Sequence, residues 1–133
     1  MARPWNWNIH YDGRLAACIP AAARSVVDVG CGDGFLAARL AARIPTVVAL
    51  DVHEPVLARA RARFPHAPVT WIHADLLSGH PVPGAPFDAV VSNATLHHFT
   101  DVGVALARLR GLVAAGGVLA VVPFTRMERR ELV

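Results

Sequence analysis

A short glycine-rich segment, GCGDG at residues 30–34, is the first feature of this sequence that could do chemistry. Glycine has no Cβ, so its backbone can turn sharply and come close to a ligand. The segment stands between an apolar run and a helical pattern, and the free N–H groups of a helix N-terminus would face the same ligand. Its spacing is G-x-G-x-G, and Phe35 occupies the third glycine position of the dinucleotide fingerprint G-x-G-x-x-G. The spacing therefore disfavours a nicotinamide dinucleotide.

Polar residues also follow the next apolar runs of the chain. Asp51 comes twenty-one residues after Gly30, and a carboxylate at that point can accept hydrogen bonds from both hydroxyls of a ribose. The alternative is that Asp51 caps a helix that begins near Pro55. The segments HADL at residues 73–76 and SNATLHHF at residues 92–99 end the following two runs. If the runs are parallel strands, all these polar groups lie at one edge of a sheet.

The elements that must position these residues alternate along the chain. Short β-branched apolar runs predict strands, and the amphipathic segments between them predict helices. The predicted strands are residues 25–29, 46–50, 69–73, 87–91 and 117–122. The predicted helices are residues 35–44, 55–64 and 102–113, the last capped by Asp101 or Thr100, with an amphipathic segment at 13–23 and a loop at 76–86. This alternation predicts an α/β fold, a three-layer doubly wound Rossmann-like sheet whose ligand lies beyond the carboxyl ends of the strands.

Composition excludes several other classes. The 133 residues are 54% hydrophobic and 17% charged, which indicates a single globular domain over residues 1–133. No apolar run approaches the ~18 residues of a membrane span, and no signal peptide is visible, so we expect a soluble, cytoplasmic protein without a membrane partner. The net charge of +3 comes from scattered arginines, which predicts no nucleic-acid partner. The cysteine and histidine spacings predict free thiols and no metal site.

Five segments, in this order, resemble the motifs of class I S-adenosylmethionine (SAM)-dependent methyltransferases. They are VVDVGCGDG (26–34), ALDV (49–52), IHADL (72–76), FDAVVSN through LHHF (87–99) and LRGLVAAGGVL (109–119). The resemblance covers about residues 5–122, and residues 5–11 also resemble the start of a small bacterial subgroup. It implies SAM as cofactor, a small-molecule methyl acceptor, and the strand order 3-2-1-4-5 followed by two strands that this chain lacks.

The resemblance also implies which residues hold SAM. The methionine portion would lie against Gly30, Cys31 and Gly32, with Asp28 orienting its amino group. Asp51 would bind the ribose and Val52 would pack on the adenine, whereas Asp75 would face the adenine amino group beside the backbone of Ala74 and Leu76. Ser92 and Asn93 would lie close to the sulfonium. SAM carries no phosphate, which fits the missing third glycine and the absence of lysine.

His97 and His98 are the candidate general bases, because their pKa lies near neutrality and they stand beside the expected cleft. The alternative is that one of them packs or caps at the start of the helix that follows Asp101. In the N-terminal segment, residues 1–24, His10 and Tyr11 could close over the cofactor as a lid. Trp5 and Trp7 of the same segment could equally be ordinary packing.

The end of the chain departs from the family pattern. Only residues 123–133 follow the Rossmann-like core of residues 25–122, so the fifth strand becomes an apolar edge with unpaired backbone groups. We expect either a truncated product or a partner strand on this edge, including self-association. Four readings stay open: a small-molecule methyltransferase, an inactive SAM-binding remnant, a nicotinamide oxidoreductase, and a nucleic-acid methyltransferase, for which residues 92–95 lack the Asn-Pro-Pro-aromatic pattern.

Overall fold

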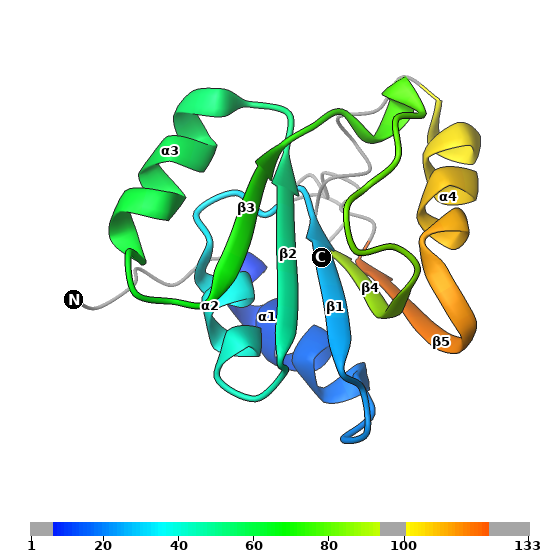
Figure 1. Ribbon diagram of the computed structural model, residues 1–133, viewed down its shortest axis with the longest axis horizontal. Helices are drawn as coiled ribbons and strands as arrows, with labels where there is room; N and C mark the ends of the chain where they lie inside the picture. The colour runs from blue at the N-terminus through cyan, green and yellow to red at the C-terminus, as the bar shows by residue number, and fades with distance from the viewer. Residues whose placement is uncertain (1–6, 94–100, 123–133) are drawn as a thin grey trace, which may run out of the picture.

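Five strands form one sheet in the order β3-β2-β1-β4-β5, and every pairing is parallel (Figure 1). The computed structural model describes residues 7–93 and 101–122, with side chains from residue 11 onward. The strands are β1 (Ser25–Val29), β2 (Thr46–Asp51), β3 (Val69–His73), β4 (Phe87–Asn93) and β5 (Val113–Val122). The helices are α1 (Trp7–Cys18), α2 (Phe35–Ala41), α3 (Glu54–Arg63) and α4 (Val102–Gly111), with a 3-10 turn, η1, at Leu76–Ser78. The predicted fold class and strand order are confirmed.

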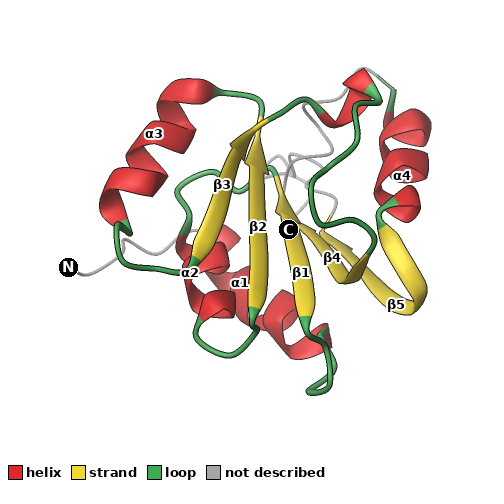
Figure 2. Ribbon diagram, viewed as in Figure 1, coloured by secondary structure: helices red, strands yellow, loops and turns green. Residues whose placement is uncertain are grey.

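Helices cover both faces of the sheet, which gives the three predicted layers (Figure 2). Successive strand side chains point to opposite faces, so Val26 packs with α1 and α2 whereas Val27 packs with α4. Both valines are fully buried. Because the strands are covered on both sides, they are apolar along their length instead of alternating with polar residues.

Local sequence explains where the helices begin. The Asp101 side chain accepts a hydrogen bond from the backbone N–H of Val104 at 3.0 Å, so the predicted cap of α4 is confirmed. Helix α3 begins one residue before Pro55, whose fixed φ suits a first turn. The predicted helix ends at residues 44, 64 and 113 lie one to three residues beyond the observed ends, because the last turn of each helix departs from α-helical geometry.

The N-terminal helix differs from its prediction. It was expected over residues 13–23, but α1 spans Trp7–Cys18 and stops before Pro20, which has no N–H for a further helical bond. Its apolar stripe of Leu15 and Ala16, with Ile19 after it, is buried against the sheet. Over the described residues, no helix has the length and apolar character required to cross a lipid bilayer.

The last strand begins earlier than expected. The sequence predicts a connection through Gly116 and a strand from Gly117, but β5 already pairs with β4 at Val113. The register then shifts, because Gly116 adopts φ +77° and forms an irregularity in the strand. At Gly117 a Cβ would lie 2.8 Å from the carbonyl oxygen of Asp88, so only glycine fits. Within the described residues, β5 is an outer strand, as predicted.

Candidate functional site

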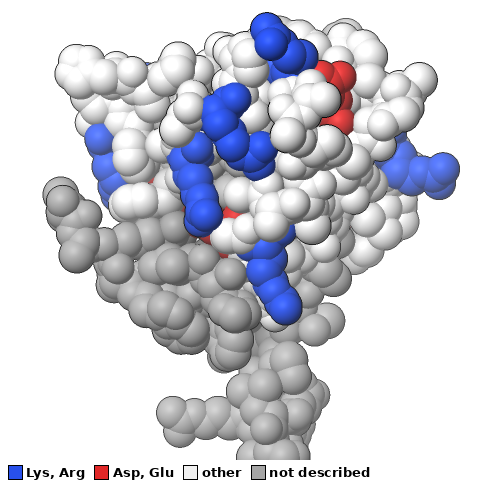
Figure 3. All heavy atoms as spheres, turned by 90° about the horizontal axis from the view of Figure 1, so that it is seen from below, with Lys and Arg blue, Asp and Glu red and all other residues white. Residues whose placement is uncertain are grey.

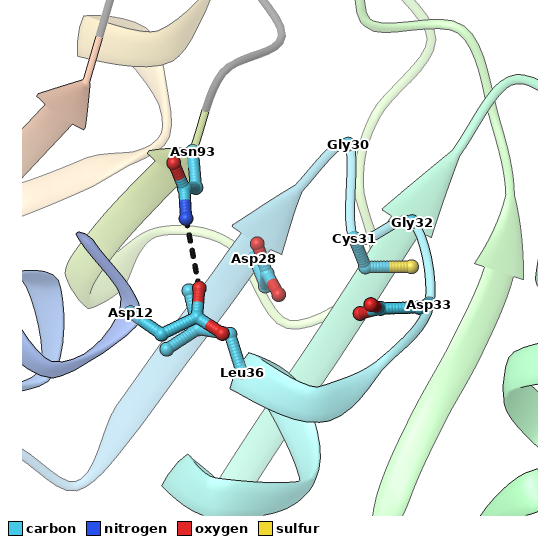
Figure 4. Close-up of a pocket in the computed structure, with 8 residues that line it drawn as sticks. All are labelled: Asp12, Asp28, Gly30, Cys31, Gly32, Asp33, Leu36 and Asn93. Carbon is cyan, nitrogen blue, oxygen red and sulfur yellow. Dashed lines mark hydrogen bonds between the residues drawn. The ribbon is translucent and has the colours of Figure 1, made fainter. Parts of the chain in front are cut away.

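A pocket opens beyond the carboxyl end of β1, between the glycine-rich loop and α1 (Figure 4). The residues that line it are Asp12, Asp28, Gly30, Cys31, Gly32, Asp33, Leu36 and Asn93. Five of these, namely Asp28, Gly30, Cys31, Gly32 and Asn93, are predicted site residues. The pocket is therefore where the sequence expects a ligand, at the switch point of a doubly wound sheet.

Backbone hydrogen bonds fix the glycine-rich loop against the neighbouring strand. The N–H groups of Gly30 and Cys31 both donate to the carbonyl oxygen of Leu50, at 2.8 and 2.9 Å. At Gly32, φ is +53° and a Cβ would meet nothing within 4 Å, so this position leaves open space at the pocket. At Gly34, φ is +85° and a Cβ would lie 2.9 Å from side-chain atoms of both Ala60 and Trp71. Gly32 thus keeps room for a ligand, whereas Gly34 allows α2 to pack closely.

Asp51 holds the loop from the end of β2. Its Oδ2 accepts a hydrogen bond from the N–H of Gly32 at 3.0 Å, and its Oδ1 accepts one from the N–H of His53 at 2.9 Å. The residue in the cap position of α3 is His53, so the alternative that Asp51 caps this helix is wrong. Val52 is 56% exposed beside it, which leaves an apolar surface available to a ligand.

Asp28 is a pocket residue whose carboxyl group is buried away from solvent. It is only 1% exposed, and its Oδ2 has no hydrogen-bond partner in the described structure. Burial raises the pKa of Asp28 to about 8, and the neighbouring charges of Asp12, Asp33 and Asp51 act in the same direction. A cation in the pocket would satisfy the orphaned oxygen and favour the carboxylate form.

Asp12 is a pocket residue that the sequence analysis missed. It comes from α1, is 5% exposed, and its Oδ1 accepts a hydrogen bond from Nδ2 of Asn93 at 2.8 Å. A signal for it does exist in the sequence: Asp12 precedes the buried Leu15, Ala16 and Ile19 by three, four and seven residues. That spacing places its carboxylate on the buried face of the helix. Asp33 and Leu36 were also not predicted to line the pocket.

Cys31 also lines the pocket, but it does not have the properties of a reactive thiol. It is 7% exposed, and burial, followed by the charges of Asp28 and Asp51, raises the pKa of its thiol. A thiol that stays protonated is a poor nucleophile. Cys18 is exposed, and both cysteines are free.

The remaining predicted residues are distributed around the site. Ser92 is buried, and its hydroxyl donates to the carbonyl oxygen of Val29 at 3.1 Å. Leu76 is buried in the core on the α4 side of the sheet. Asp75 stays exposed at the end of β3, where its carboxylate accepts from the N–H of Leu77 at 2.9 Å. The backbone N–H of Ala74 donates to the carbonyl oxygen of Asp51 at 3.1 Å, which ties the two strand ends together.

Several predictions lie outside the described residues. They concern His97 and His98, the side chains of Trp5, Trp7 and His10, and the tail at residues 123–133. Over the residues whose placement is described, no group of three or more His, Cys, Asp or Glu is arranged to hold a metal ion.

The charge of the pocket defines what it can bind. Among the described residues, three carboxylates line it and no basic side chain does. On the side of the molecule seen from below, opposite the pocket edge, arginine side chains are spread over the surface among uncharged atoms and a few acidic ones (Figure 3). A cavity with one sign of charge concentrates ligands of the opposite sign. The pocket therefore suits a cationic ligand.

Comparison with known proteins agrees with this geometry. Residues 27–121 match the family model described as a methyltransferase domain. An uncharacterized methyltransferase of Mycobacterium tuberculosis is 59% identical over 131 residues, which are 98% of this chain and 66% of that protein. A trans-aconitate 2-methyltransferase of Methylobacterium radiotolerans is 42% identical over 110 residues, 80% of this chain and 41% of the other.

A solved structure shows the same fold. The amino pentose methyltransferase from Micromonospora echinaspora, determined with SAM bound, is 29% identical and superposes with a TM-score of 0.73 over 89% of this chain and 50% of its own. The chain thus spans about two thirds of the mycobacterial relative and about half or less of the other two. The family match covers most of the sheet and the whole glycine-rich loop, and it shows that the chain belongs to the class I SAM-dependent methyltransferases.

Proposed function

We propose that this protein binds SAM at the end of β1 and transfers its methyl group to a small-molecule acceptor. The observation that carries the proposal is the buried Oδ2 of Asp28, which has no hydrogen-bond partner among the described residues and lies in a pocket lined with carboxylates and glycines. SAM carries a positive sulfonium, a positive ammonium group and one carboxylate, so its net charge is positive. The residues present therefore fit the charge of SAM, and the space at Gly32 fits a ligand close to the backbone.

Each end of the site would hold a different part of SAM. Asp28 would accept a hydrogen bond from the ammonium group, and Asp51 would accept from the ribose hydroxyls through oxygens that already lie beside Gly32. Val52 would cover the adenine with its exposed side chain, and Asp75 would face the adenine amino group. These assignments use groups on three successive strand ends, which the sheet brings to one edge.

Methyl transfer from SAM requires the protein mainly to align the acceptor with the methyl group. SAM supplies a methyl group on a sulfonium, which leaves as a neutral thioether. The task of this chain is to hold the cofactor rigidly and to exclude water, and such positioning can contribute several kcal/mol to the rate. An acceptor that must lose a proton needs a base as well, and His97 and His98 stay the candidates for that role.

A second candidate function is SAM binding without turnover. The chain spans 66% of the mycobacterial relative and 41% of the trans-aconitate 2-methyltransferase. The described residues of the pocket fit the cofactor, and none of them is assigned to a methyl acceptor. We keep this alternative because affinity for SAM and transfer of its methyl group are separable properties.

Isothermal titration of the protein with SAM, S-adenosylhomocysteine and NAD tests the cofactor. We expect binding of the first two and none of NAD. Methyl transfer from labelled SAM is then measured with trans-aconitate and with amino sugars, the acceptors named for the relatives. Methyl transfer supports the proposed methyltransferase activity. Binding of SAM without transfer to any acceptor supports the binding-only alternative. The absence of SAM binding would reject both.

A further inference from the structure

We propose that Asp12 is a second cofactor-binding carboxylate, which together with Asp28 accepts the ammonium group of the methionine end of SAM. This inference rests on the proposed function. The residue lies outside the strand ends that supply the rest of the site, because it comes from α1 (Trp7–Cys18). It would make the N-terminal helix part of the cofactor site instead of a cover alone.

The first step is position. Asp12 and Asp28 both line the pocket, and both are buried, at 5% and 1% exposure (Figure 4). The two carboxylates are near enough for the charge of Asp12 to act on Asp28. Asp28 contributes an oxygen with no hydrogen-bond partner among the described residues. A ligand group with several N–H donors and a positive charge would satisfy both side chains.

The second step is orientation. The Nδ2 group of Asn93, at the end of β4, donates to Oδ1 of Asp12 at 2.8 Å. This bond fixes the carboxylate at the carboxyl edge of the sheet, across the pocket from the glycine-rich loop (Figure 4). Asn93 therefore acts as a positioning residue for Asp12, and the contact joins two elements that are 81 residues apart in the chain.

The third step concerns the desolvation cost of burying two carboxylates in one pocket. A buried carboxylate is more costly than a neutral amide or hydroxyl group, because its charge loses hydration. The neighbouring charge of Asp12 is also one of the causes that raise the pKa of Asp28. A ligand ammonium group between the two side chains would offset the cost of burying their charged forms.

The experiment compares two ligands that differ at the methionine end. S-adenosylhomocysteine carries the ammonium group, whereas 5′-methylthioadenosine keeps the adenosine and the sulfur but has no amino-acid portion. We expect Asp12→Asn to weaken S-adenosylhomocysteine by roughly 10- to 100-fold, the range for a lost hydrogen bond to a charged group. Binding of 5′-methylthioadenosine should change by less than about twofold, since it makes no contact with Asp12 in the proposed arrangement.

The matched control is Asp33→Asn, which removes the same charge from the same pocket. The Asp33 Oδ1 atom accepts from the N–H of Phe35 at 3.3 Å, and we expect this variant to weaken S-adenosylhomocysteine much less than Asp12→Asn. An equal effect of the two variants would mean that Asp12 contributes only to the overall charge of the pocket, and this result would overturn the proposal. Asp12→Glu keeps the charge and should recover part of the affinity.

Two other results would also overturn the inference. One is unchanged affinity of Asp12→Asn for S-adenosylhomocysteine. The other is an equal loss of both ligands in Asp12→Asn and Asp12→Glu, because it would show that Asp12 maintains the fold and not the contact. If the unmodified protein bound neither ligand, the proposed function itself would fail, and that outcome is distinct from the others.

Discussion

Carboxylates at the two ends of the proposed cofactor site differ in how their oxygens are satisfied. At the end proposed for adenosine, Asp51 and Asp75 accept hydrogen bonds from backbone N–H groups within a few residues or on the adjacent loop. At the end proposed for methionine, Asp12 and Asp28 are buried, and one oxygen of Asp28 has no hydrogen-bond partner among the described residues. Local backbone groups therefore orient the first pair, whereas we propose that a ligand cation completes the second.

This difference indicates how each end of the proposed site would contribute to the free energy of ligand binding. A carboxylate that is already hydrogen-bonded is held in place before the ligand arrives, so it contributes shape and orientation. A buried carboxylate that lacks a partner contributes charge, because the ligand relieves its desolvation. The variants below test this contrast.

The largest effect is expected at Asp51. Asp51→Asn should weaken S-adenosylhomocysteine by about 100-fold, because it removes the charged acceptor for the ribose and also weakens the contact with the Gly32 N–H. Unlike Asp12→Asn, it should weaken 5′-methylthioadenosine to the same degree, since both ligands contain the ribose. Titration calorimetry of both ligands measures this. Asp88→Asn is the control, because Asp88 accepts from the N–H of Arg24 at the opposite edge of the sheet; retention of 5′-methylthioadenosine binding in Asp51→Asn would contradict the assignment.

The next effect is a pH dependence that belongs to Asp28. Its pKa is about 8 in the fold, above the ordinary aspartate value of 3.8, so over this range the folded state keeps a proton that the unfolded state releases. Stability against unfolding should therefore fall as pH rises between about 4 and 8 and then level off. The ammonium group of S-adenosylhomocysteine would pair with the carboxylate form of Asp28, so affinity for this ligand should rise as pH approaches 8, by up to about tenfold per pH unit.

Asp28→Asn tests whether Asp28 causes both pH dependences, that of stability and that of ligand affinity. The amide cannot titrate, so denaturant unfolding and calorimetry at a series of pH values should show flatter curves than the unmodified protein. Asp88→Asn should keep the original curves. If Asp28→Asn left both pH profiles unchanged, the titrating group would lie elsewhere in the molecule.

Two glycines of the same loop should separate binding from stability. Gly32→Ala places a Cβ in open space at the pocket, at φ +53°, so we expect about tenfold weaker binding and a stability loss near 1–2 kcal/mol. Gly34→Ala would bring a Cβ to 2.9 Å from Ala60 and Trp71, so its main effect should be a stability loss of roughly 2–4 kcal/mol. Thermal unfolding and ligand titration of both variants measure the two effects. A larger stability loss at Gly32 than at Gly34 would speak against this division.

The smallest effect is expected at Val52. Its side chain is 56% exposed and lies outside the core, so Val52→Ser should leave the melting temperature nearly unchanged. Loss of apolar contact with the adenine should weaken both ligands by about two- to fivefold. An effect on S-adenosylhomocysteine alone would place Val52 away from the adenine.

The sequence by itself determined the sheet and its active edge. Apolar runs such as residues 25–29 and 46–50 predict buried parallel strands because they lack polar alternation, and the glycine spacing after the first run predicts a ligand loop. Gly30, Gly32 and Asp51 follow from that pattern, since a residue at the end of a parallel strand must lie at the common edge. Asp28 was predicted only through the resemblance to the family.

Only the tertiary structure decided which carboxylates meet. Asp12 and Asn93 are 81 residues apart, and their contact depends on how α1 packs against the sheet. The pairing of β4 with β1 places the Ser92 hydroxyl against the carbonyl oxygen of Val29, whereas the next residue, Asn93, lines the pocket. The irregular start of β5 could also not be predicted from the sequence. The positive φ of Gly116 depends on the pairing of β5 with β4 and not on a local preference. Periodicity fixes which face a side chain takes, but burial and partners arise only when separate elements pack together.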